Sequence, residues 1–116
     1  MIPKYRAWDR ETKSMNGMAE IYRNRKQEIE LHPRDENIIL MQSTGLRDKN
    51  GKEIFEGDVL GTKDGLLDGV VEYRTDLGMW TNSLFRYNNF ERLCNVADST
   101  YIIGNIYENP ELLEAN

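Results

Sequence analysis

Short apolar runs separated by turn-forming residues constrain the fold of this chain more than any other feature of its sequence. Runs such as 4–9, 70–74 and 101–107 are rich in β-branched and aromatic residues, and Gly, Asn and Asp cluster between them. The run Ile38–Gln42 is apolar enough to predict a strand buried on both faces. Strands at a spacing of roughly 8–12 residues are typical of β-sandwiches and barrels. The sequence therefore predicts a mainly β protein with minor α structure.

The segment 18–32 is compatible with two kinds of secondary structure. Met18, Ile21 and Tyr22 have the spacing of one helix face, whereas residues 28–32 alternate cleanly between apolar and polar side chains. The alternation is the clearer signal, and a polar turn precedes it. We therefore favour a β-hairpin over residues 18–32.

Two local signals near the end of the chain predict departures from regular strand structure. Gly104 interrupts the last apolar run, which indicates a β-bulge or a close approach of another segment. Asn109 is followed by Pro110 and Glu111, the pattern of an N-cap and the first turn of a helix. The sequence therefore predicts a bulged last strand and a short helical turn after it.

The distribution of strands and turns predicts two regions. Residues 1–54 predict an N-terminal β-rich region that contains the hairpin, and residues 55–116 predict a small C-terminal barrel with a short helical turn at its end. A chain of 116 residues can bury one modest core. We therefore expect the two regions to pack together, either with separate small cores or with one shared core.

Charge is unevenly distributed along the chain and argues against a protein whose main role is to coat a polyphosphate. The chain carries 15 Lys and Arg against 20 Asp and Glu, a net charge of −5. Residues 1–53 hold 11 basic and 9 acidic side chains, whereas residues 54–116 hold 4 and 11. An acidic surface of this kind is typically a solubility feature, and the first half leaves room for a local basic patch.

The chain has the features of a cytoplasmic protein. Its one cysteine, Cys94, allows no intramolecular disulfide, which fits a reducing compartment. Its first residues lack the apolar stretch that a secretory signal needs, and its longest aliphatic run, Ile38–Met41, is far shorter than a membrane span. We therefore expect a cytoplasmic location and no membrane segment.

Three segments of the chain resemble one protein family. They are KYRAWD near the start, LMQSTGLRDKNGKEIFEGDVL in the middle and IIGNIYENPELL at the end. In this order they resemble the YopX family of phage and prophage proteins over almost the whole chain, although the stretches 15–35 and 62–98 contribute little. The resemblance implies a small protein of the bacterial host cytoplasm, mostly β, with an SH3-like β-barrel in its C-terminal half. It implies no particular activity.

The central segment Leu40–Leu60 has two interpretations. The polar residues 47–50 could form a binding loop on a tight turn. Alternatively, Asn50-Gly51 and Gly57 supply backbone angles that turns require, and Asp58 can accept hydrogen bonds from neighbouring backbone N–H groups. We favour the second interpretation, a scaffold, because each residue of the segment has a local structural role.

Residue types with catalytic or metal-binding chemistry are few and scattered. His32 is the sole histidine and Cys94 the sole thiol, so a nucleophile–base pair would need both to meet in the fold. A surface histidine and a buried structural cysteine are the better interpretation. The sequence also lacks the glycine motifs of phosphate loops and the spacing of a calcium loop. We therefore predict no enzymatic activity, no cofactor and no metal site. An enzyme that uses His32 or a carboxylate pair in a concave pocket is the third and least favoured hypothesis.

Aromatic residues of the predicted barrel are the best candidates for a contact surface. Tyr and Trp bury a large area at low cost in conformational entropy, and we single out Tyr73, Trp80 and Tyr87. Packing in the core is the competing interpretation for all three. The leading hypothesis is a non-enzymatic accessory protein that binds another protein or copies of itself.

A second hypothesis is nucleic-acid binding through the more basic front half. Its candidate residues are Arg23, Arg25, Lys26 and Arg34. They could contact a phosphate backbone. The interleaved acidic residues and the net charge favour a solvated turn instead.

Overall fold

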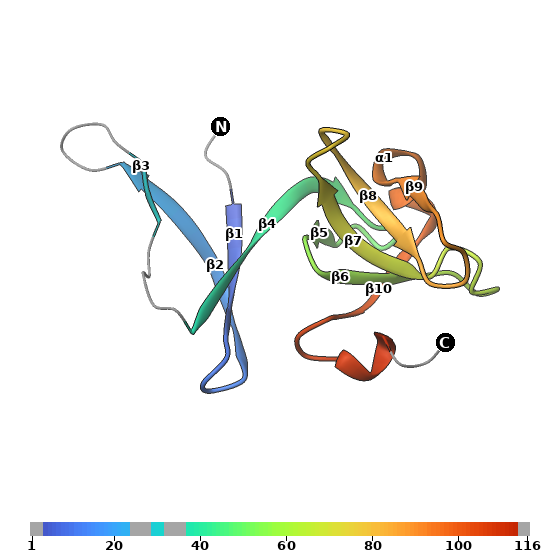
Figure 1. The fold of residues 1–116 in the computed structure, drawn as a ribbon. Helices are drawn as coiled ribbons and strands as arrows, with labels where there is room; N and C mark the ends of the chain where they lie inside the picture. The colour runs from blue at the N-terminus through green and yellow to red at the C-terminus, as the bar shows by residue number, and fades with distance from the viewer. Residues whose placement is uncertain (1–3, 24–28, 32–36, 114–116) are drawn as a thin grey trace. The chain divides into compact units, whose positions relative to one another are not determined.

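The fold of the chain is mainly β, which confirms the prediction (Figure 1). The computed structural model describes residues 4–23, 29–31 and 37–113, with side chains described outside 16–31. Its strands are β1 (Lys4–Asp9), β2 (Ser14–Arg23), β3 (Ile29–Leu31), β4 (Ile38–Arg47), β5 (Glu53–Phe55), β6 (Asp58–Gly61), β7 (Gly69–Arg74), β8 (Met79–Leu84), β9 (Phe90–Arg92) and β10 (Tyr101–Asn105). Its helices are α1 (Leu93–Val96) and the 3₁₀ turns η1 (Ala97–Ser99) and η2 (Pro110–Leu113). None of these described helices has the length and apolar character needed to cross a membrane.

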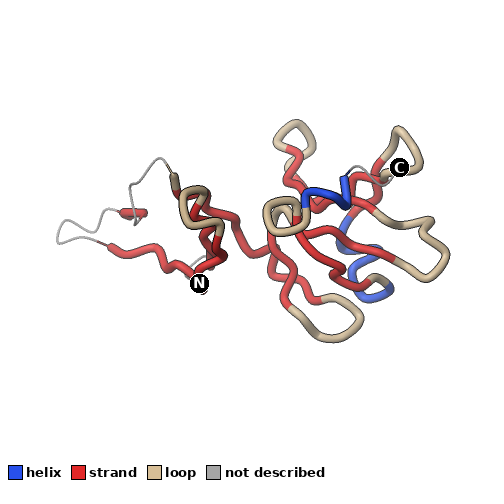
Figure 2. The backbone as a smooth tube through the Cα atoms, turned by 90° about the horizontal axis from the view of Figure 1, so that it is seen from below, coloured by secondary structure: helices blue, strands red, loops and turns tan. Residues whose placement is uncertain are grey.

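The chain divides into two compact units, residues 1–43 and 44–116. Figure 2 shows that the helical turns among the described residues all belong to the second unit. The predicted boundary follows residue 54, whereas the segment 44–54 groups with the second unit, because the side chain of Ile54 lies in the core of that unit. The expectation that the two regions pack together stays a prediction.

The first unit is built on antiparallel pairing in the order β3-β2-β1-β4. The hairpin predicted over residues 18–32 is present, since β2 pairs with β3 and places Tyr22 opposite Glu30. The expectation that Ile38–Gln42 is buried on both faces is wrong. Met41 is buried, but Gln42 beside it is exposed, because only one face of this part of β4 is covered.

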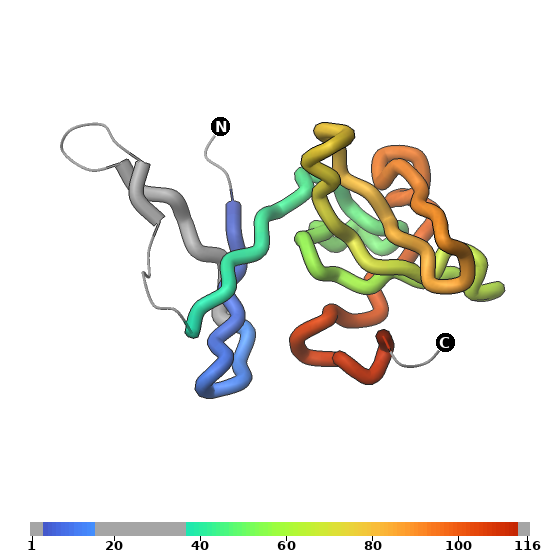
Figure 3. Tube along the Cα trace, in the orientation of Figure 1, coloured from blue at the N-terminus to red at the C-terminus, as the bar shows by residue number. Residues whose placement is uncertain are grey.

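The second unit is an antiparallel sheet in the order β10-β6-β7-β8-β9, accompanied by the hairpin of β5 with the end of β4. The last strand, β10, therefore returns beside β6, which is the first strand of this sheet along the chain. In Figure 3 the orange-red β10 segment passes the green β6 segment. This order agrees with the small SH3-like barrel expected for the second half.

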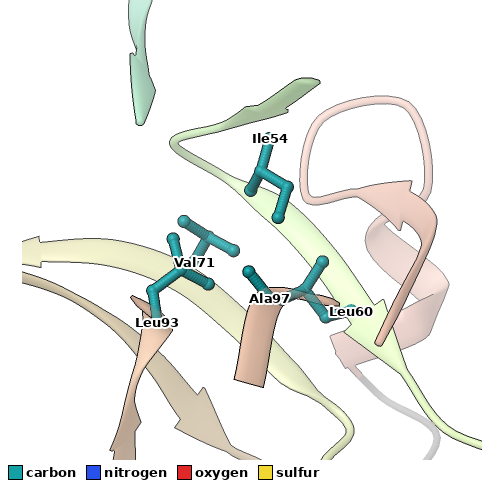
Figure 4. Close-up of a cluster of buried hydrophobic side chains, with 5 residues drawn as sticks. All are labelled: Ile54, Leu60, Val71, Leu93 and Ala97. Atoms are coloured by element: carbon teal, nitrogen blue, oxygen red, sulfur yellow. The ribbon is translucent and has the colours of Figure 1, made fainter. Parts of the chain in front are cut away.

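The core of the second unit is a cluster of apolar side chains from five separate segments. Ile54, Leu60, Val71, Leu93 and Ala97 are almost completely buried and point toward one another (Figure 4). Because these side chains come from β5, β6, β7, α1 and η1, the cluster ties the short strands to the helical turns. Burying each large aliphatic side chain stabilises the fold by about 1.5–3 kcal/mol.

The end of the second unit contains the predicted bulge and the predicted helical turn, but the side chain of Asn109 bonds to the strand. The register of β10 against β6 shifts between Ile102 and Gly104, and a Cβ atom added at Gly104 would lie 2.5 Å from Oδ1 of Asn109. That oxygen accepts a hydrogen bond from the backbone N–H of Asn105 at 3.2 Å. The predicted helical turn is present as the 3₁₀ turn η2, and Asn109 precedes it as predicted, with its backbone oxygen accepting from the N–H of Leu112 at 3.0 Å. Its side chain, however, turns back to the strand.

Two glycines allow a test of how tightly the β7–β8 hairpin is built. A Cβ atom at Gly69 would lie 2.4 Å from the backbone oxygen of Ser83, whereas one at Gly78 would meet nothing within 4 Å but would sit at a φ of +63°. We expect Gly69→Ala to lower the free energy of unfolding by at least about 2–3 kcal/mol through overpacking. Gly78→Ala should cost only about 1 kcal/mol for the left-handed backbone. Urea unfolding measures both, and an equal loss in the two variants would contradict the close packing at Gly69.

Candidate functional site

The turn that joins β4 to β5 is organised by the carboxylate of Asp48. Its Oδ1 accepts hydrogen bonds from the backbone N–H groups of Asn50 at 2.9 Å and Lys52 at 2.8 Å. Its Oδ2 accepts one from the N–H of Ile102 at 3.0 Å, which lies 54 residues away in the sequence. The side chain is 5% exposed. Asp48 therefore fixes the turn and also joins it to β10.

The hydrogen bonds of Asp48 keep it ionised despite its burial. Desolvation by burial raises the pKa of this carboxyl, and the three backbone N–H groups of Ile102, Lys52 and Asn50 together lower it more. The positive charge of Lys52 lowers it further. The net effect is a pKa below the usual value, so the group is a stable anion at neutral pH with its hydrogen bonds satisfied.

These contacts support the scaffold interpretation of the segment Leu40–Leu60. Gly51 has a φ of +82° and closes the turn by donating from its N–H to the backbone oxygen of Asp48 at 2.9 Å. Asp58 is buried and accepts a hydrogen bond from the N–H of Phe55 at 2.8 Å, as predicted. The sequence pattern predicts an exposed loop position for Asp48 and does not reveal its structural role. An acidic residue two positions before an Asn-Gly pair was the available local signal.

The aromatic candidates Tyr73 and Trp80 lie together on the β7–β8 hairpin. They face each other across the two strands with ring centroids 5.1 Å apart and the ring planes inclined by 74°. Trp80 packs against the core cluster, whereas Tyr73 is 43% exposed. Leu77, in the turn that follows β7, is 41% exposed. We call Tyr73, Leu77 and Trp80 the hairpin tip.

The third candidate, Tyr87, belongs to a different surface of the second unit. It lies in the loop between β8 and β9, is 50% exposed and lines a cleft together with Arg74. Successive side chains of a strand point to opposite faces, so Arg74 and its neighbour Tyr73 lie on opposite faces of the sheet. The structure therefore brings Tyr73 and Trp80 together and places Tyr87 elsewhere.

The cleft beside Tyr87 has a volume of about 290 Å³ and lies at the β8–β9 end of the sheet. Its lining residues are Arg74, Ser83, Leu84, Tyr87, Asn88, Asn89 and Phe90. We call it the Arg74 cleft. Asn89 closes its loop, because its backbone oxygen accepts from the N–H of Leu84 at 3.0 Å and its Oδ1 accepts from the N–H of Phe90 at 2.8 Å.

Arg74 is the one charged residue among the lining residues of this cleft, and its guanidinium is held on two sides. Its Nε and Nη2 donate to the two carboxylate oxygens of Asp76 at 3.0 and 2.9 Å. Its Cζ lies 5.0 Å from the centroid of the Phe90 ring. The hydrogen bond to Asp76 raises the pKa of Arg74, and the same hydrogen bond lowers the pKa of Asp76. Both groups are therefore charged at every physiological pH.

Several predicted residues fall outside what the structure describes. Arg25, Lys26, Arg34 and His32 lie in undescribed segments, and Arg23 is described by its backbone alone. Nucleic-acid binding through these residues therefore stays a prediction. Among the described residues, no group of three His, Cys, Asp or Glu side chains could hold a metal ion.

The expectation of a buried cysteine is wrong, because Cys94 is exposed. The short helix α1 buries Leu93 and Val96, and the two residues between them face outward. The thiol of Cys94 lies 3.7 Å from the side-chain oxygen of Asn95.

Comparison with known proteins places this geometry in a family. Residues 4–114 match the family model described as YopX protein. The chain is similar to the crystal structure of protein EF1440 from Enterococcus faecalis, with 32% sequence identity, coverage of 97% of this chain and 99% of that one, and a TM-score of 0.51. It is also similar in fold to the crystal structure of protein yopX from Bacillus subtilis, with 23% sequence identity and a TM-score of 0.58. That match covers 100% of this chain and 99% of the other. A search of curated proteins found no match.

The hydrogen bonds of Asp48 predict a pH-dependent loss of stability. Asp48→Asn replaces one acceptor oxygen by an N–H donor, and we expect the free energy of unfolding to fall by about 2–3 kcal/mol at pH 7. The folded pKa lies below the ordinary value of 3.8. The stability that ionised Asp48 contributes is therefore present above pH 3.8 and is lost as the pH falls through the pKa of the folded state.

Urea unfolding of wild type and Asp48→Asn at several pH values checks this expectation. The difference in free energy of unfolding between wild type and Asp48→Asn should be largest at pH 7 and should shrink below about pH 4. Asp98→Asn is the matched control, since Asp98 is an exposed acid on η1. A difference that is the same at pH 7 and at pH 3 would show that the charge of Asp48 contributes nothing.

Proposed function

Because the chain belongs to the YopX family, we propose that it is a phage- or prophage-encoded accessory protein that acts by binding, without catalysis. The partner is another protein or a second copy of the same chain, met in the cytoplasm of the bacterial host. The proposal involves no cofactor and no metal ion.

The observation that carries this proposal is the exposed hairpin tip. Val71 and Tyr73 lie on the same face of β7, yet Val71 is 1% exposed and Tyr73 is 43% exposed. The apolar face of the sheet therefore continues beyond the covered core and reaches solvent at Tyr73, with exposed Leu77 in the adjoining turn. Aromatic residues are enriched in protein interfaces, because their apolar rings are buried on association while the tyrosine hydroxyl can stay solvated.

Two leucines with nearly equal exposure allow a matched test of this proposal. Leu77 in the hairpin tip is 41% exposed, and Leu66 in the loop between β6 and β7 is 43% exposed. We expect Leu77→Ser to weaken association by at least about tenfold, which corresponds to about 1.4 kcal/mol. Leu66→Ser should leave association unchanged.

Two measurements identify the partner. Sedimentation velocity over a range of concentrations reports self-association. Capture of the tagged protein from lysate of prophage-bearing cells, after nuclease treatment, reports a protein partner present in fixed proportion. The proposal is refuted if the chain stays monomeric and captures no protein from the lysate in a way that the Leu77→Ser change weakens. Retention of nucleic acid that is lost at higher salt would replace it with the nucleic-acid hypothesis.

A further inference from the structure

The Arg74 cleft contains polar atoms that the fold itself leaves unused. A guanidinium has five N–H donors, and Asp76 takes two of those of Arg74. The remaining donors, the Ser83 hydroxyl, the Tyr87 hydroxyl and the Asn88 amide have no hydrogen-bond partner among the described residues. All four side chains line the same cleft. Convergent polar groups beside aromatic rings are one feature of ligand-binding sites.

The guanidinium of Arg74 is also positioned before any ligand arrives. Asp76 holds one of its edges through two hydrogen bonds, and the Phe90 ring lies against it at 5.0 Å. Its unused donors face away from Asp76, because the two bonded nitrogens share one edge of the planar group. A ligand that accepts from these donors therefore loses little side-chain entropy on binding, since the arginine rotamer is already fixed.

The charge around the cleft disfavours an anionic ligand. Asp76 forms an ion pair with Arg74 at 2.9 Å and compensates its charge. Glu72, two residues earlier on β7, contributes further negative potential and raises the pKa of Arg74. The other lining residues are uncharged. A phosphate or a carboxylate would therefore meet a neutralised arginine among acidic neighbours, whereas an uncharged acceptor would meet no repulsion.

The shape of the cleft and the state of the neighbouring strand favour one kind of ligand. A volume of about 290 Å³ is at the lower limit of ligand cavities, so the cleft admits a short stretch of chain. A peptide backbone supplies carbonyl acceptors for Arg74 and both donors and acceptors for the Asn88 amide. Strand addition to β9 is blocked at Phe90, whose N–H already donates to Oδ1 of Asn89. The peptide would therefore be bound by side chains of the cleft.

We propose that the Arg74 cleft is a docking site for an extended, uncharged peptide segment of a protein partner. Arg74 donates to a backbone carbonyl of the peptide, Asn88 pairs with the next peptide group, and the exposed ring of Tyr87 packs against an apolar side chain. The inference rests on the proposed binding function and adds a second surface to it, on the sheet face opposite the hairpin tip.

The test uses the full chain and a displayed library of random 12-residue peptides. Peptides that are enriched on wild-type protein are synthesised, and their affinity is measured by titration calorimetry. We expect enriched sequences to contain an aromatic residue or proline and to lack Asp and Glu in the shared segment. Arg74→Lys, which keeps the charge but loses the planar fork, should weaken binding at least tenfold, and Tyr87→Ser should do the same.

Two controls separate the cleft from a general effect on the protein. Arg92→Lys changes a different arginine of the same sheet, which is exposed and does not line the cleft, and Leu77→Ser changes the hairpin tip. Both variants should bind the selected peptides as wild type does. Thermal unfolding followed by circular dichroism confirms that each variant is folded.

Four outcomes would overturn the inference. One is a library with no sequence enriched on wild type, and another is a set of peptides that bind Arg74→Lys and Tyr87→Ser as tightly as wild type. Enrichment of acidic peptides would show that charge, and not the fork geometry, selects the ligand. An oligonucleotide of ten thymidines serves as a parallel probe, and its tighter, cleft-dependent binding would assign the cleft to nucleic acid. Each outcome leaves the test of the hairpin tip unaffected, because that test reads association through Leu77.

Discussion

The carboxylate of Asp48 is the contact on which the second unit depends most. Its hydrogen bonds to Asn50 and Lys52 shape the β4–β5 turn, and its hydrogen bond to Ile102 holds that turn against β10. A strand of five residues cannot persist alone, and β10 lies at the end of the sheet with β6 as its one strand neighbour. On its other side, β10 is held by the buried carboxylate of Asp48, which accepts from the N–H of Ile102. This carboxylate joins the first and last parts of the unit beside the apolar cluster, against which Ile102 also packs.

The same device protects both edges of this sheet. At one edge, the N–H of Ile102 is bound by Asp48, and the N–H of Lys49 donates to the backbone oxygen of Thr100 at 2.8 Å. At the other edge, the N–H of Phe90 is bound by the side chain of Asn89. Unpaired edge strands invite addition of foreign strands, and an N–H group that already donates to a side-chain oxygen cannot pair with one. We therefore expect recognition by this unit to use side chains on its faces and loops, which is where the hairpin tip and the Arg74 cleft lie.

Features encoded by neighbouring residues were predictable, and features set by distant contacts were not. Alternation and turn residues located the strands, the β2–β3 hairpin and the bulge at Gly104. The role of Asp48 depends on Ile102, and nothing in the sequence near either residue indicates the other. The errors at Gln42 and Cys94, and the unforeseen bond of the Asn109 side chain to Asn105, have the same origin, since tertiary structure decides what covers a side chain or occupies its hydrogen-bonding atoms. Tyr87 and Arg74 are 13 positions apart, and only the hairpin geometry makes them neighbours.

The alternation of side chains along β7 determines how the two surfaces can be used together. Tyr73 and Arg74 are consecutive residues, so the hairpin tip and the Arg74 cleft lie on opposite faces of one strand. A flat partner surface can cover one face or the other but not both. A partner that engages both surfaces must therefore wrap around the end of the β7–β8 hairpin, with an ordered region against Tyr73 and Leu77 and an extended segment in the cleft. Such an arrangement adds the two binding energies with a short connection between them, and the second contact then forms at a high effective concentration.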